Sequence, residues 1–175
     1  MSVHELEIRL AQATDAPEIL EWFGIVGSET EFLSVDESGL SQTEEELQAF
    51  LEQVAERDNE VCLLALIDED LAGLVLVTAD QRFRVAHIGD FFIAVKQAYW
   101  GHGLGQALME ETLHWAREYS SLRRLQLTVQ ARNRGAIHLY EKMGFAVEGR
   151  QERGAQLRDG SFVDVILMGQ LIDWE

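Results

Sequence analysis

The sequence is short of basic residues, cysteine and long apolar runs, and each shortage excludes a class of protein. Only 14 Lys and Arg stand against 31 Asp and Glu, a net charge of −17, so the clustered cations that bind nucleic-acid phosphates are missing. A single cysteine, Cys62, excludes an internal disulfide, and its place in an apolar run predicts a small buried side chain. No stretch approaches the ~20 apolar residues of a membrane helix. We therefore expect a cytoplasmic protein with neither a nucleic-acid nor a membrane partner.

Proline is also scarce, and apolar side chains are plentiful enough for a substantial core. Of the 175 residues, 47% are hydrophobic and one is proline. This length and composition are typical of a single domain, so we expect residues 1–175 to form one unit. The acidic surface favours cationic small molecules as ligands, although the same charge also serves solubility alone.

Apolar spacing and capping residues predict the first elements. Alternating apolar and charged residues predict a strand over 6–10 with one buried face. A cap at Thr14 or Asp15 begins a helix that ends at Gly27, and a capping box of Thr43 with Glu46 begins a second amphipathic helix. The acidic segment 28–42 between them is predicted to be a loop.

The same reasoning predicts the remaining elements. Apolar runs at 61–67 and 71–77 form a hairpin, a strand covers 85–95, and further strands cover 125–129 and 163–171, with a short helix over 136–143. A helix begins near residue 104. Its predicted core-facing stripe is Leu104, Leu108, Thr112, Trp115 and Tyr119, opposite Gln106, Glu110, His114 and Glu118. The predicted order is β-α-α-β-β-β-α-β-α-β-β.

A glycine-rich turn, W-G-H-G-L-G at 100–105, stands between a strand and a helix. Alternating glycines allow a tight turn that exposes backbone N–H groups, and the positive end of the helix dipole follows them, so phosphate oxygens are natural ligands. The spacing is not the G-x-G-x-x-G of dinucleotide-binding folds, and Gly105 is not followed by the Lys and Ser or Thr of a P-loop. Both of those functions lose support.

A second motif, N-R-G-A-I-H-L-Y-E-K-M-G-F, covers 133–145. Together the two motifs resemble those of the GNAT superfamily of acyl-CoA-dependent N-acetyltransferases. The resemblance extends over nearly the whole chain, including an Asp159-Gly160 turn before the last strand. It implies an α/β (α+β) fold with a mixed, mostly antiparallel central sheet and helices on both faces.

The resemblance also implies acetyl-CoA as cosubstrate, with its phosphates on the turn amides and its pantetheine arm along a strand edge that splays from its neighbour. The residues that it assigns to cofactor binding are Ile93, Ala94, Val95, Trp100, Gly101, His102, Gly103, Leu104, Gly105, Gln106, Asn133, Arg134, Ala136 and Tyr140. Trp100 departs from the Gln or Arg that the family has at that position. Lys96, His102 and Arg134 are nearby cations that compensate for it or are simply solvated.

Catalysis requires a proton donor for the departing thiolate and a base for the attacking ammonium. By its place in the second motif, Tyr140 is predicted to be the donor. Candidates for the base are Glu31, in the acidic loop, and Asp90, in the strand that leads to the glycine turn. No group of residues has the spacing of a metal site, and none is expected.

The predicted reaction is direct transfer of the acetyl group to a primary amine in a ternary complex, with a small cationic amine as the expected acceptor. A peptide or protein N-terminus is the alternative acceptor. Two non-catalytic readings stay open, an acyl-CoA-binding module and a nucleotide-binding regulator. A homodimer could form through the strand at 163–171 with Trp174, although a buried last strand explains the same apolar residues.

Overall fold

The computed structural model describes residues 4–173, and Trp174 lies outside them. The elements in chain order are β1 (Leu6–Leu10), α1 (Ala16–Glu29), α2 (Glu44–Glu56), β2 (Val61–Ile67), β3 (Asp70–Ala79), β4 (Ile88–Val95), α3 (Leu104–Glu118), β5 (Arg124–Gln130), α4 (Arg134–Lys142), β6 (Ala146–Gln156) and β7 (Phe162–Leu171). This confirms the predicted order of strands and helices. The capping box of Thr43 with Glu46 is present at the start of α2.

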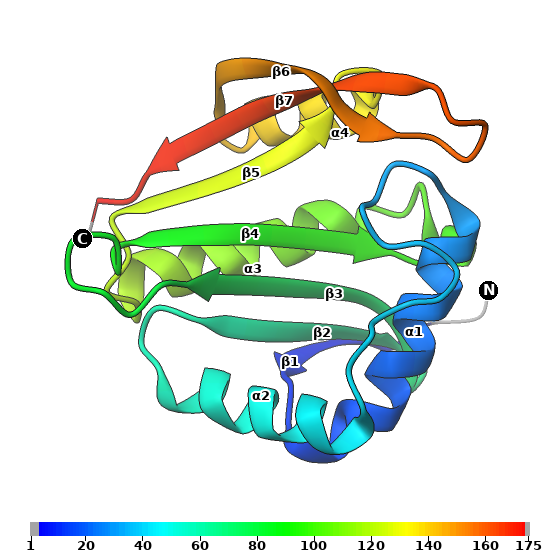
Figure 1. The fold of residues 1–175 in the computed structure, drawn as a ribbon. Coiled ribbons are helices and arrows are strands. Elements are labelled where there is room, and N and C mark those ends of the chain that lie inside the picture. Colours follow the sequence, from blue (N-terminus) through cyan, green and yellow to red (C-terminus); the bar gives the residue numbers. More distant parts are fainter. Residues whose placement is uncertain (1–3, 174–175) are drawn as a thin grey trace.

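The strands form a seven-stranded sheet in the order β1-β2-β3-β4-β5-β7-β6 (Figure 1). All neighbours are antiparallel except β4 and β5, which are parallel. The sheet is therefore mixed and mostly antiparallel, as predicted. The Asp159-Gly160 turn also forms, with Gly160 at a φ of 85° and the Asp159 carboxylate accepting from the Ser161 N–H at 2.9 Å.

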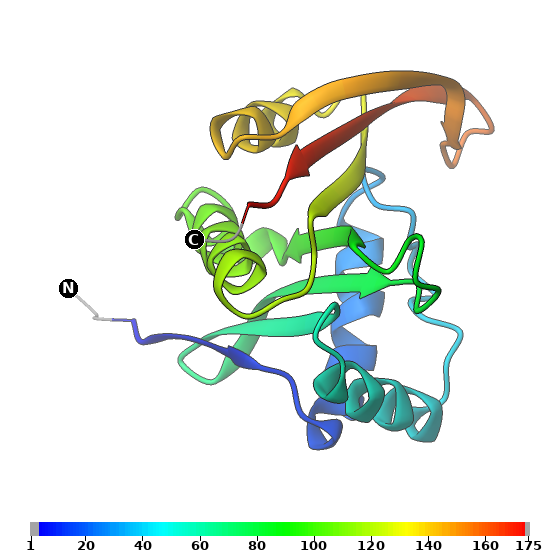
Figure 2. The ribbon, with the colours of Figure 1, turned by 90° about the vertical axis from the view of Figure 1, so that its left-hand side faces the viewer.

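Helices cover both faces of the sheet, with α3 and α4 on one side and α1 and α2 on the other (Figure 2). Because side chains alternate along a strand, β2 serves both layers. Val61 and Leu63 pack in the core with α3, whereas Cys62 and Leu64 pack with α1 and α2. Cys62 is buried as predicted, and burial raises the pKa of its thiol to about 12.

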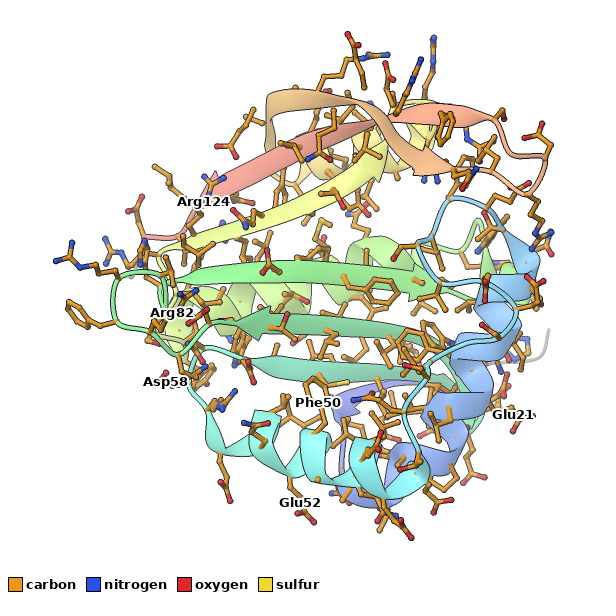
Figure 3. The ribbon with its side chains drawn as sticks, viewed as in Figure 1. Glu21, Phe50, Glu52, Asp58, Arg82 and Arg124 are labelled. Carbon is orange, nitrogen blue, oxygen red and sulfur yellow. The ribbon has the colours of Figure 1, made fainter. Side chains whose placement is uncertain are left out.

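The acidic side chains of the helices face away from the core. Glu21 on α1 and Glu52 on α2 are exposed and point outward, whereas the partly buried Phe50 packs against the core beneath α2 (Figure 3). This arrangement follows the amphipathic pattern, with apolar stripes inward and charges in solvent. Among residues 4–173, every helix is too short or too polar to cross a bilayer.

Two predicted element boundaries and one predicted helix face were wrong. Helix α1 continues past Gly27 to Glu29, and β4 begins at Ile88 because the preceding residues form a turn in which the Val85 N–H donates to the Arg82 carbonyl. On α3, Tyr119 is the 72% exposed C-terminal cap rather than a core residue. Trp115 is only partly buried. The residues that complete the buried face of α3 are Met109, Leu113 and Ala116. Spacing of four residues drifts around a helix of 3.6 residues per turn, which misplaced the stripe.

Gly27 does not end the helix but allows close packing against it. A Cβ at this position would overlap the carbonyl of Asp36, so the loop after α1 lies directly on the helix. Gly24, one turn earlier, is different, because its Cβ would meet only the Glu37 carbonyl oxygen at an ordinary 3.7 Å. The close approach at Gly27 holds residues 30–37 near the end of β4.

The two glycines give a matched test of this packing. We expect Gly24→Ala to stabilise the protein by about 0.5–1 kcal/mol, since alanine favours helix. Gly27→Ala gains the same propensity but clashes, so a net destabilisation of about 1–3 kcal/mol is expected. Urea denaturation of both variants measures the difference. Equal free energies of unfolding for the two would show that the loop does not press on α1.

Candidate active site

The glycine turn forms a cradle of free backbone donors. Gly101 and Gly103 adopt positive φ values of 81° and 76°, and α3 begins directly afterwards at Leu104. Within the described chain, the amide N–H groups of residues 101–106 have no hydrogen-bond acceptor. A Cβ at either glycine would meet nothing within 4 Å, so the backbone is open to a ligand. Six such amides at a helix start suit an anion such as a pyrophosphate.

Beside the cradle, β4 and β5 diverge and leave backbone groups unpaired. They pair only at Ile88–Asp90 with Arg124–Gln126, and the two strands separate beyond that point (Figure 1). The Lys96 N–H donates to the Ala72 carbonyl on the β3 side, so by alternation Ile93 and Val95 direct their amides toward β5. An amide-bearing chain entering this gap could extend the ladder as an extra strand.

A cavity of about 680 Å³ joins the cradle to the gap. It extends from the glycine turn, between β4 and β5, to the loop after α1 and to β6 and β7. The lining that the sequence predicted consists of Ile93, Ala94, Val95, Trp100, Gly101, Gly103, Leu104, Gly105, Asn133, Ala136 and Tyr140. The two motifs, at 100–105 and 133–145, therefore meet around one cavity.

Tyr140 projects from α4 into this cavity and packs edge-on against Phe145, with ring centroids 6.1 Å apart. Burial raises the pKa of its phenol to about 12. The phenol therefore keeps its proton at neutral and mildly alkaline pH. A group in this state can donate a proton but is poorly suited to accept one.

Trp100 locks the turn to the end of β4. Its indole Nε1–H donates to the Val95 carbonyl at 2.7 Å, although the residue is 47% exposed. An Arg or Gln here would offer a side-chain donor to phosphate, whereas Trp100 uses its only donor on the protein. A phosphate bound at this turn would therefore receive hydrogen bonds from the backbone and none from the Trp100 side chain.

The other predicted cofactor residues fall into two groups. Asn133 lines the cavity and also caps α4, because its side chain accepts from the Ala136 N–H at 3.3 Å. His102, Gln106 and Arg134 lie outside the cavity lining. Gln106 instead bridges α3 and α4 by accepting from Lys142 Nζ at 3.0 Å.

Lys96, one of the cations expected near the turn, forms an ion pair with a carboxylate. Its Nζ lies 3.1 Å from Asp70, which also accepts from the Tyr99 hydroxyl at 2.7 Å. Partial burial alone would raise the pKa of Asp70, but these two hydrogen bonds together hold it below its ordinary value. The charge of Lys96 is therefore largely balanced, and Tyr99, which lines the cavity, is fixed in place.

Neither carboxylate predicted as the base belongs to the cavity lining. Asp90 accepts from Gln126 Nε2 at 2.8 Å, at the last residue pair before β4 and β5 separate. Glu31 accepts from the Arg158 N–H at 2.7 Å, at the tip of the β6–β7 hairpin. Their role as base stays a prediction.

Sequence reasoning missed several lining residues. Glu29 is the one charged side chain among the described lining residues, and its carboxylate accepts from the Gln97 N–H at 3.2 Å. Thr128 and Gln130 line the opposite wall on β5. Residues 127–130 of β5 all line the cavity, but the strand partners that place β5 there are distant in sequence.

Residues 27–145 match the family model described as the acetyltransferase (GNAT) family. The chain belongs to that family. Within it, an L-amino acid N-acetyltransferase of Escherichia coli is 35% identical over 120 residues, which are 69% of this chain and 74% of that protein. The GNAT fold also agrees with a crystal structure of a GNAT-family acetyltransferase from Streptococcus pneumoniae, 51% identical, with a TM-score of 0.92 over 96% of this chain and all of that one.

A spermidine N(1)-acetyltransferase of Escherichia coli is 36% identical over 83 residues, which are 47% of this chain and 43% of that protein. As a GNAT enzyme, this protein is an acetyltransferase that uses acetyl-CoA. The residues present fit that donor, because free turn amides match its phosphates and unpaired strand amides match its pantetheine arm.

The bond from Trp100 to Val95 yields a test of the cradle. Trp100→Phe removes the indole donor but keeps an aromatic ring, so we expect acetyl-CoA to bind about fivefold more weakly, the equivalent of one hydrogen bond. Calorimetric titration measures the dissociation constant. Trp115→Phe, on α3 outside the cavity lining, is the control. Equal affinities for both variants would mean that the turn is held without the indole.

Proposed function

We propose that this acetyltransferase moves the acetyl group directly from acetyl-CoA to a small primary amine, with both substrates bound at once. The observation that carries the proposal is the continuous cavity, which contains the phosphate cradle, the strand gap and Tyr140. Acetyl-CoA supplies an activated acetyl thioester when bound. The chain has to orient that group, admit the amine and supply a proton to the leaving sulfur.

Tyr140 is proposed as the proton donor. It faces the cavity, and its pKa of about 12 keeps the proton on its oxygen at working pH. The step expels a thiolate, which takes a proton readily, so a buried phenol beside it would favour the forward direction. The attacking ammonium must lose a proton as well, and Glu31 and Asp90 remain the predicted candidates for that role.

A cationic acceptor is favoured by charge. Glu29 brings a negative charge to the lining, and among the described lining residues no Lys, Arg or His balances it. A carboxylate in a partly enclosed cavity attracts ammonium groups more strongly than one in open water. The similarity to a spermidine acetyltransferase points to the same class of acceptor.

A free L-amino acid is the second candidate. It is favoured by the similarity to an L-amino acid acetyltransferase and by Arg132, whose guanidinium lies 4.9 Å from the ring of Phe32 in the cavity wall. Among the described residues, no carboxylate forms an ion pair with Arg132. An amino-acid carboxylate could bind it.

The first test is Tyr140→Phe. We expect kcat to fall by about 100-fold or more, because a positioned general acid contributes at least that much, while the dissociation constant of acetyl-CoA stays within about twofold. CoA release with a primary amine acceptor and calorimetry give the two numbers. An unchanged kcat would remove Tyr140 from the chemistry. No acetyl transfer by the wild-type protein, with acetyl-CoA bound, would favour a non-catalytic acyl-CoA-binding module.

The acceptor class is tested at Glu29. We expect Glu29→Gln to raise KM for spermidine about tenfold, since a partly enclosed ion pair is lost, and to change KM for L-leucine little. Steady-state kinetics with both amines, at saturating acetyl-CoA, separate the candidates. A wild-type enzyme that prefers L-leucine, and whose KM for it rises in Arg132→Ala, would support the amino acid instead.

A further inference from the structure

The end of α1 and the loop after it are tied to the rest of the cavity by contacts that the proposed reaction does not use. Residues 27–37, here called the wall segment, supply Glu29, Thr30, Phe32, Leu33 and Ser34 to the cavity lining. Gln151, Gly154 and Ala155 of β6 line the same cavity. Where the wall segment lies therefore determines how wide the cavity is on this side.

Glu31 connects the wall segment to two separate elements. Its main-chain carbonyl accepts from Gln130 Nε2 at 2.7 Å, and Gln130 is only 6% exposed at the end of β5. Its carboxylate accepts from the Arg158 N–H at 2.7 Å, at the tip of the β6–β7 hairpin. These contacts span 99 and 127 residues of sequence, so they fix tertiary positions and not local turns.

Further contacts of Arg158 and Gln130 hold the wall segment in the same position. Arg158 Nη2 donates to the carbonyls of Gly27 at 3.4 Å and Ser28 at 3.5 Å, near the end of α1. Gln130 Oε1 accepts from Arg132 Nε at 2.8 Å, and the Arg132 guanidinium lies over Phe32. The residues on both sides of Glu31 are thus held by hydrogen bonds or ring contacts. The Glu31 carboxylate itself contacts the β6–β7 hairpin and does not line the cavity.

We propose that Glu31 is a positioning residue, which holds the wall segment against β5 and the β6–β7 hairpin and so fixes the acceptor side of the cavity to the width of a small amine. This proposal rests on the proposed transfer to a small amine. It gives Glu31 a different task from the proton transfer for which its position in the acidic loop first suggested it. A carboxylate that already accepts a backbone N–H at 2.7 Å is well placed to hold a loop.

Two substitutions at Glu31 separate the roles. Glu31→Gln keeps an oxygen that can accept the Arg158 N–H but cannot act as a base, whereas Glu31→Ala loses both. We expect Glu31→Ala to raise KM for the amine about tenfold, the loss of one charge-assisted hydrogen bond, while KM for acetyl-CoA stays within about twofold. Glu31→Gln should restore most of the acceptor KM. Glu21→Ala, an exposed carboxylate on α1, controls for the change in net charge.

The acceptor used is whichever of spermidine and L-leucine the wild-type enzyme acetylates faster. Amide hydrogen exchange of residues 30–37 gives a second readout that needs no acceptor, and exchange should quicken at least about tenfold in Glu31→Ala but not in Glu31→Gln or Glu21→Ala. In Glu31→Ala, kcat/KM for a tetrapeptide with a free N-terminus should rise relative to kcat/KM for the small amine, because the acceptor side of the cavity is wider.

Two results would overturn the proposal, and a third would overturn the proposed function on which it rests. If Glu31→Gln loses kcat as severely as Glu31→Ala and the acid limb of the kcat/KM profile shifts, Glu31 transfers the proton. If Glu31→Ala leaves both acceptor KM and exchange unchanged, the contacts do not position the wall segment. If the wild-type enzyme acetylates neither amine, the proposed function fails in its small-amine form, and the exchange rates alone decide whether Glu31 holds the segment.

Discussion

The pairing of β4 with β5 stops after three residue pairs, and the arrangement of the site depends on that early stop. Each strand is fully engaged on its other side, β4 by β3 and β5 by β7, over seven residue pairs each. The sheet therefore consists of two fully hydrogen-bonded halves, which are joined only where β4 and β5 pair. The bond from Gln126 to Asp90 lies at that junction and adds a side-chain contact to the last pair. Unpaired amides beyond it would be costly in a closed sheet, but at the wall of a cavity they are available to a ligand.

The same chain solves an electrostatic problem. It carries a net charge of −17, yet acetyl-CoA brings several phosphate charges. The free backbone amides at the start of α3 offer a partial positive charge that does not depend on Lys or Arg. Of the two lysines near the turn, Lys96 pairs with Asp70, and Lys142 donates to Gln106 Oε1. The negative charge elsewhere on the surface, and at Glu29 in the cavity, is therefore compatible with the cationic acceptor proposed above.

Local signals predicted the fold well. Strand alternation, the capping box at Thr43 and the glycine turn all depend on neighbours in sequence, and each is present. The end of α1 was misplaced because Gly27 is required by contact with Asp36, which no local pattern reports. Turn geometry likewise shortened β4 at its start.

The site was predictable only where a motif named it. The motifs singled out Tyr140 and the turn glycines, which line the cavity, and their roles stay predictions. The wall after α1, in contrast, is held by segments 99 or more residues apart that meet through Gln130, Glu31 and Arg158. The burial of Cys62 has a practical consequence for studying that wall. A buried thiol with a pKa of about 12 is almost wholly protonated and shielded from solvent, so alkylating reagents will not react with it. A cysteine introduced on the wall segment would then be the only reactive thiol in the chain, ready to carry a spectroscopic label without prior removal of the native one.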